Sequence, residues 1–83
     1  MNEVPISDEE SAYLRELGAR IFIARRRKGL IQKDLAVMCG CNPITISRIE
    51  RGTLKTSIIR LRQIKIALDM DWNEVFPPKE PKH

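Results

Sequence analysis

The segment that most constrains the fold runs from residue 32 to 52, QKDLAVMCGCNPITISRIERG, and holds two short helical patterns around one glycine. Before Gly40, apolar residues recur at the spacing of one helical face. After it, Asn42-Pro43 is a helix start signal, because asparagine caps well and proline fits the first helical position. Gly52 then ends the second pattern. The segment is therefore predicted to fold as two short helices joined by a tight turn, the geometry of a helix-turn-helix.

Three further helices are predicted around this pair, and no segment has the pattern of a strand. A Ser-x-x-Glu capping box at Ser7 precedes a long periodic run, which predicts a helix over roughly 8–28. Apolar residues at three- and four-residue steps predict a fourth helix over 58–68. An Asp-x-x-Glu box at Asp71 predicts a short fifth helix through Phe76. The expected fold is all-α, with five helices.

The 83 residues are expected to form one compact domain, since a chain this short buries only about 60% of the surface that its unfolded form exposes. We divide it into an N-terminal extension that includes the start of the first helix (1–16), a helical domain (17–76) and a tail (77–83). The tail, PPKEPKH, is too rich in proline and charge to pack and is predicted to be disordered.

Positive charge is concentrated in the middle of the chain. Residues 17–66 carry twelve Lys or Arg against two acids, whereas residues 1–16 and 67–83 are both net acidic, and the formal net charge is +4. A basic body of this kind suggests a polyanion as partner, because each phosphate that is neutralised releases condensed counterions. Charge alone leaves open the alternative of a solvated basic face without a partner.

The Cys-Gly-Cys sequence at residues 39–41 raises the question of a metal or redox site. Cys39 and Cys41 fall on the apolar interior of the predicted helix pair, where a free cysteine behaves as a small hydrophobe. A structural zinc site needs four ligands and the only other candidate is His83, while cysteines two residues apart do not readily form a disulfide. Both cysteines are therefore assigned to the core, and neither a metal site nor a cofactor is expected.

An enzyme and a membrane protein are both disfavoured. The single histidine lies in the tail, so no nucleophile, base and orienting group can be placed together. Nothing approaches the roughly 18 consecutive apolar residues that a membrane span needs, and the acidic start MNEVPISDEE lacks the apolar segment of a signal peptide. We expect a cytoplasmic protein that is not an enzyme.

The stretch LGARIFIARRRKGLIQKDLAVMCGCNPITISRIERG and the later ALDMDWNEVF carry a more specific signal. Together they resemble the lambda-repressor and Cro-like helix-turn-helix family, often called the XRE family, from about Leu17 to Phe76. The resemblance implies a compact five-helix, lambda-repressor-like domain whose second and third helices form the helix-turn-helix. It also implies binding of double-stranded DNA through the third helix, and association with the nucleoid when the protein is bound.

The resemblance assigns DNA contacts to individual residues. Base-facing roles fall on the outward side of the third helix, on Pro43, Ile44, Thr45, Ser47 and Arg48. Arg48 is the best-equipped reader, because its fork can take guanine O6 and N7 together, whereas Pro43 and Ile44 offer only apolar contact, for example to a thymine methyl. Phosphate contacts fall on the groups that frame the groove, namely Gln32, Asn42, Arg51, Thr53 and Lys55.

Two further expectations concern the helices that support the third. The resemblance pairs Arg25 with Glu50 as a salt bridge between the first and third helices, and a carboxylate facing phosphate would be repelled. Ile31 stands where the family usually has Ser or Thr. The second helix therefore lacks a hydroxyl cap that is worth about 1 kcal/mol.

Several apolar residues are predicted to be exposed. Phe22 and Ile23 stand where the family usually has charged residues, and Ile59 and Ile66 lie on the outer side of the fourth helix. Exposed apolar groups in this number suggest an interface. The alternative is that the N-terminal residues, with Tyr13 and Leu14, fold back to cover some of them.

Two functions of different classes are consistent with these patterns. The first is a sequence-specific DNA-binding transcriptional regulator, acting as a repressor that binds an inverted repeat as a homodimer. The second is an antitoxin-type interaction module, which binds a partner protein through its apolar patch and regulates its own operon. Co-purification with a neighbouring gene product separates the two.

Overall fold

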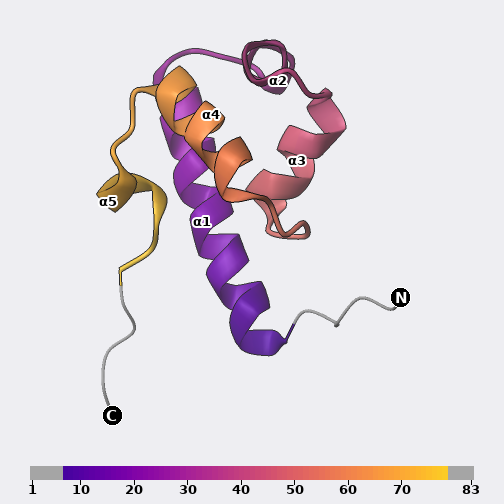
Figure 1. Ribbon diagram of the computed structural model, residues 1–83, viewed down its shortest axis with the longest axis vertical. Helices are drawn as coiled ribbons and strands as arrows, with labels where there is room; N and C mark the ends of the chain where they lie inside the picture. Colours follow the sequence, from indigo (N-terminus) through magenta and orange to yellow (C-terminus); the bar gives the residue numbers. More distant parts are fainter. Residues whose placement is uncertain (1–6, 79–83) are drawn as a thin grey trace.

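The computed structural model describes residues 7–78, which form five helices and no strand (Figure 1). The helices are α1 (Asp8–Arg27), α2 (Gln32–Cys39), α3 (Pro43–Arg51), α4 (Ile58–Leu68) and α5 (Trp72–Val75). The all-α fold class predicted from the sequence is confirmed, with α1 and α5 each ending one residue earlier than expected.

The helices begin where side chains satisfy free backbone N–H groups. At α1 the Ser7 hydroxyl accepts from the Glu10 N–H and the Glu10 carboxylate accepts from the Ser7 N–H, both at 3.1 Å. At α3 the Asn42 side-chain oxygen accepts from the N–H groups of Ile44 and Thr45, at 3.0 and 3.2 Å. An unpaired N–H at a helix start is costly, so these local contacts fix the helix boundaries.

The turn between α2 and α3 depends on Gly40, whose φ of 66° lies in the left-handed region. This conformation reverses the chain at low cost only for glycine. The Cys41 N–H then donates to the Ala36 carbonyl at 3.0 Å, which closes the end of α2. The two helices of the motif are thereby joined by a turn with a single defined geometry.

The long helix α1 supports the rest of the fold. Figure 1 shows α1 running behind α4, with α2 and α3 to one side and α5 to the other. A Cβ atom at Gly18 would lie 2.3 Å from the Ile49 carbonyl oxygen and 2.4 Å from that of Glu50, so α1 and α3 cross in backbone contact at this glycine. The residues buried between the helices are Leu17, Ile21, Leu35, Ala36, Cys39, Ile46, Ile49, Leu61, Ile64, Leu68, Met70 and Val75.

The two cysteines lie where apolar residues would be expected. Cys39 is buried with 3% of its surface exposed, and Cys41 is half-buried against the core. Burial raises the pKa of the Cys39 thiol, and the neighbouring Cys41 adds to the effect. Across residues 7–78, no three His, Cys, Asp or Glu side chains come together as a metal ion would require.

No helix within the described part is long and apolar enough to cross a membrane. The division at residues 16 and 76 remains a prediction, and the predicted disorder of the tail falls mostly outside the described residues.

Candidate nucleic-acid interface

One face of α3 is buried and the opposite face is open. Ile46 and Ile49 are both nearly inaccessible, and they hold α3 against α1 and α2. The five residues predicted to face bases lie away from these two, with Pro43, Ile44 and Arg48 exposed and Thr45 and Ser47 half-buried. Ile44 is 60% exposed, so the open face of α3 carries an apolar side chain as well as polar ones.

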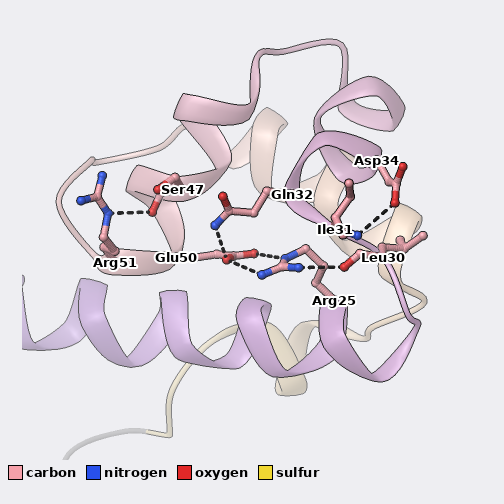
Figure 2. A network of polar contacts seen from close by, with 8 residues as sticks. All are labelled: Arg25, Leu30, Ile31, Gln32, Asp34, Ser47, Glu50 and Arg51. Carbon is pink, nitrogen blue, oxygen red and sulfur yellow. Dashed lines mark hydrogen bonds and ion pairs between the residues drawn. The ribbon is translucent and has the colours of Figure 1, made fainter.

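The only carboxylate of α3 is turned away from the open face. Glu50 accepts from Arg25 Nε at 2.6 Å and from Arg25 Nη2 at 3.0 Å, and 4% and 6% of the two side chains are exposed (Figure 2). A bidentate pair of this kind is geometrically specific. Arg25 Nη1 also donates to the Leu30 carbonyl at 2.7 Å, which fixes the chain between α1 and α2.

Gln32 joins the same network. Its Nε2 donates to Glu50 Oε1 at 3.0 Å, so its side chain turns toward the buried pair (Figure 2). Within residues 7–78, no buried side-chain nitrogen or oxygen lacks a hydrogen-bond partner. Gln32, predicted to contact phosphate, thus also donates a hydrogen bond to Glu50, a second role that no local sequence pattern indicates.

The start of α2 is capped from one side only. Ile31 has no acceptor to offer the first-turn N–H groups, as expected from the sequence. The Asp34 carboxylate nevertheless accepts from the Ile31 N–H at 3.0 Å (Figure 2). The acid in the first turn therefore supplies half of a capping box that lacks its hydroxyl half.

Two of the predicted phosphate contacts lie at the ends of α3. Asn42 uses its side-chain oxygen to cap α3, and this cap does not involve its amide nitrogen. Arg51 lies in the last turn, and its Nε donates to the Ser47 carbonyl at 3.3 Å (Figure 2). Both side chains belong to exposed residues.

Two further predicted phosphate contacts, Thr53 and Lys55, lie on the loop between α3 and α4. The Thr53 hydroxyl donates to the Arg48 carbonyl at 3.3 Å, which ties the loop to the end of α3. The Lys55 ammonium lies 4.0 Å from Glu10 Oε1 at the start of α1. Thr53 and Lys55 are both exposed, so the loop that follows α3 presents a hydroxyl and a cation to solvent.

Arg60 has a role that sequence patterns did not predict. Its Nη1 donates to the Cys39 carbonyl at 2.8 Å and to Gln63 Oε1 at 3.2 Å. A cation at the carboxyl end of a helix is favourable, because the last carbonyls carry partial negative charge. Arg60 therefore anchors α2 to α4.

The four residues predicted to form an interface are exposed but have different surroundings. Phe22 is 41% exposed, and its ring lies 5.3 and 5.6 Å from the guanidinium carbons of Arg25 and Arg26. Ile23 lines a hollow with Leu68 and Met70, beside the turn into α5.

The two isoleucines of α4 are 64% exposed at Ile59 and 57% exposed at Ile66. Ile66 shares a second hollow with Met38 of α2. Tyr13 and Leu14 are part of α1 itself, so the idea that these two fold back over the apolar residues is wrong. Residues 1–6, which belonged to the same idea, lie outside the described part.

Comparisons with known proteins agree with this geometry. A family model described as "Helix-turn-helix" matches residues 21–75. The restriction-modification controller protein C.AhdI from Aeromonas hydrophila has a similar structure, with 31% identity, a TM-score of 0.77 and coverage of 82% of this chain and 99% of that one. The clp gene regulator ClgR from Corynebacterium glutamicum follows with 28% identity, a TM-score of 0.73 and coverage of 76% and 67%.

A hypothetical transcription factor, NHTF from Neisseria, shares the fold at 22% identity, with a TM-score of 0.75 and coverage of 94% and 88%. A comparison with curated proteins finds no match. The family match covers well over half of the chain and includes all of α2 and α3. The chain therefore belongs to the helix-turn-helix family of Cro/C1-type (XRE) DNA-binding transcription regulators.

Proposed function

We propose that this regulator is a sequence-specific repressor that binds an inverted repeat in double-stranded DNA as a homodimer. The observation that carries the proposal is the burial of Glu50 against Arg25. With its one acid sequestered, α3 offers a duplex only neutral and cationic side chains, and charge repulsion does not oppose entry into the major groove.

Base reading is assigned to the outward side of α3. Arg48 is exposed and donates to guanine O6 and N7. Thr45 and Ser47 bring hydroxyls that either donate or accept. Pro43 and Ile44 make apolar contacts, and a thymine methyl is the group in the major groove that suits them.

Phosphate contacts position this helix without reading sequence. We assign them to Asn42, Arg51, Thr53 and Lys55, which lie at the two ends of α3 and on the following loop. Gln32 adds a contact through its second amide hydrogen, together with the N-terminal N–H groups of α2. These contacts set the register of α3 on the duplex.

The proposed regulatory role is supported by the similar solved structures and by the two-fold symmetry expected of a homodimer. C.AhdI is described as a controller protein and ClgR as a gene regulator. A short DNA-binding domain represses by occupying a promoter. Two copies related by a two-fold axis present two copies of α3, which matches inverted half-sites about 34 Å apart. Phe22, Ile23, Ile59 and Ile66 are the residues from which we expect the dimer face to be drawn.

A second candidate, an antitoxin-type module, is favoured by the exposed apolar residues of α2 and α4. Val37 is 74% exposed, and Met38, which is 55% exposed, shares a hollow with Ile66. A partner protein that covers them would also explain their exposure. Salt-resistant co-purification with a neighbouring gene product would support this function, whereas DNA binding alone would not require it.

Selection of binding sites from a random duplex library tests the proposed function. We expect enrichment of an inverted repeat whose half-site centres are about one helical turn apart. Weak, salt-sensitive binding without enrichment would contradict a sequence-specific regulator and leave only a non-specific basic surface.

A further inference from the structure

The first turns of α1 lie under the loop that follows the recognition helix. The family model begins at residue 21, so these turns precede the matched segment. Gly52, at the end of α3, is buried against them, and a Cβ atom there would lie 2.6 Å from the backbone N and Cα of Arg15. The chain leaving α3 therefore rests directly on the backbone of α1.

The next residues of the loop remain beside the start of α1. Lys55 and Thr56 form one wall of a hollow whose other wall is α1, and the lining residues from α1 are Glu9, Glu10, Tyr13 and Leu14. Across this hollow, Lys55 Nζ lies 4.0 Å from Glu10 Oε1. The two side chains are 53% and 54% exposed, so solvent reaches the pair and another anion can replace the carboxylate.

Glu10 is held in place by its own helix. Its Oε1 accepts from the Ser7 N–H at 3.1 Å, and this hydrogen bond, followed by the charge of Lys55, lowers the pKa of the carboxyl. The carboxylate is therefore ionised at neutral pH and points at the lysine while capping α1. Lys55 has a tethered counterion before any DNA binds.

We propose that the Glu10 carboxylate competes with DNA for Lys55: it holds Lys55 against α1 and must be displaced by a duplex phosphate. The inference rests on the proposed function, because it takes Lys55 as a phosphate contact. A phosphate that replaces Glu10 releases its own condensed counterion, but the freed carboxylate attracts a cation from solution. Glu10 thus lowers affinity for every duplex sequence at low salt and also reduces the dependence of affinity on salt.

The test compares the full chain with E10Q, K55Q and the double variant. Glutamine at residue 10 still accepts the Ser7 N–H, so the capping box and α1 are preserved. Binding is measured by fluorescence anisotropy across a range of salt concentrations, on the selected operator and on a duplex of scrambled sequence. Circular dichroism confirms that each variant is folded.

Glu10→Gln should tighten binding to both duplexes several-fold at low salt. It should also steepen the slope of log affinity against log salt by up to about 0.9, the value for one phosphate. Lys55→Gln should weaken binding and make the slope shallower, and the two changes in slope should together come to about 0.9. In the Lys55→Gln background, Glu10→Gln should bring no further gain.

Glu16→Gln is the matched control. It removes the same charge from the same helix, but Glu16 pairs with Arg20 at 3.2 Å, and Arg20 in turn donates to the Glu74 carbonyl at the end of α5. We expect the slope of this variant to remain that of the wild type.

Three outcomes would overturn the inference: equal effects of Glu10→Gln and Glu16→Gln, a gain from Glu10→Gln that persists in full without Lys55, or a Lys55→Gln variant that binds like the wild type. Each leaves operator preference intact. A wild-type protein that binds operator and scrambled duplex equally would instead refute the proposed function.

Discussion

Arg25 donates two hydrogen bonds to Glu50, from Nε at 2.6 Å and from Nη2 at 3.0 Å, and both side chains are buried between α1 and α3. Removing one charge leaves the other buried without its partner, which costs about 3–5 kcal/mol. Glu50→Gln should therefore lower the free energy of unfolding by about this amount, measured by urea denaturation.

A double variant separates the cost of the unpaired charge from the cost of changed packing around it. Arg25→Met with Glu50→Leu removes both charges and fills the space with apolar atoms, which is often close to neutral in stability. We expect it to be more stable than Glu50→Gln alone. A double variant as unstable as the single one would show that packing, and not the unpaired charge, dominates the loss.

Gly18 should tolerate no side chain. A Cβ atom there would lie 2.3 Å from a carbonyl oxygen of α3, so Gly18→Ala must push the two helices apart and should cost at least about 3 kcal/mol. Gly29→Ala is the control, because its φ of 75° is unfavourable for alanine but no atom lies within 4 Å. It should cost only about 1–2 kcal/mol in thermal denaturation. Equal losses would contradict backbone contact at Gly18.

Ile31→Ser should stabilise the protein. Ile31 is 60% exposed and its backbone, with φ of −88° and ψ of 168°, already has the conformation of a helix cap. A serine hydroxyl would accept an N–H of the first turn of α2 and complete the capping box with Asp34, for a gain of about 1 kcal/mol. The measurement is the midpoint of urea unfolding, with Ile31→Ala as control. A serine variant no more stable than the alanine variant would contradict the capping argument.

Arg48→Ala should cost about 1–3 kcal/mol of binding free energy on the selected operator and remove sequence preference at one base pair per half-site. Arg51→Ala, one turn nearer the end of α3, should instead weaken binding to all sequences and reduce the salt slope by about 1. Competition binding with single-base-pair variants of the operator distinguishes the two. A uniform loss for Arg48→Ala would make that residue a phosphate contact.

Cys39 and Cys41 should differ in alkylation and in stability. Iodoacetamide should modify half-buried Cys41 well before Cys39, because Cys39 is buried and burial raises the pKa of its thiol.

Cys39→Ala should lower stability by about 1–3 kcal/mol. The pKa of the Cys39 thiol is higher in the folded than in the unfolded protein. The stability that the neutral thiol contributes is therefore fully present below the unfolded pKa of about 8.5, and it is lost as pH rises through the folded pKa. Melting temperatures should therefore fall less with alkaline pH in Cys39→Ala than in the wild type.

The helix boundaries were predictable because the signals that set them are local. The capping box at Ser7, the Asn42-Pro43 pair and the left-handed Gly40 act on residues no more than a few positions away. Spacing alone also placed the open side of α3 opposite Ile46 and Ile49. Such features are encoded within one or two turns of chain.

The features that could not be predicted from the sequence depend on contacts between segments that are far apart in the chain. Gln32 and Glu50 are eighteen positions apart, and Arg60 and Cys39 twenty-one, so no local pattern announces their hydrogen bonds. The same limit explains the interface prediction. Exposure of Phe22 was predicted from the resemblance, because the family usually has a charged residue there, but the neighbours of Phe22 depend on how the chain packs.

The turn between α2 and α3 has few ways to move. Gly40 sets the backbone, the Cys41 N–H is bonded to Ala36, Asn42 caps α3, and Arg60 holds the last carbonyl of α2. A unit fixed in this way loses little conformational entropy when it binds. The DNA must then change shape to fit the protein at an imperfect site. The energy of bending or twisting base pairs that the protein never touches thus becomes part of the sequence preference of the protein.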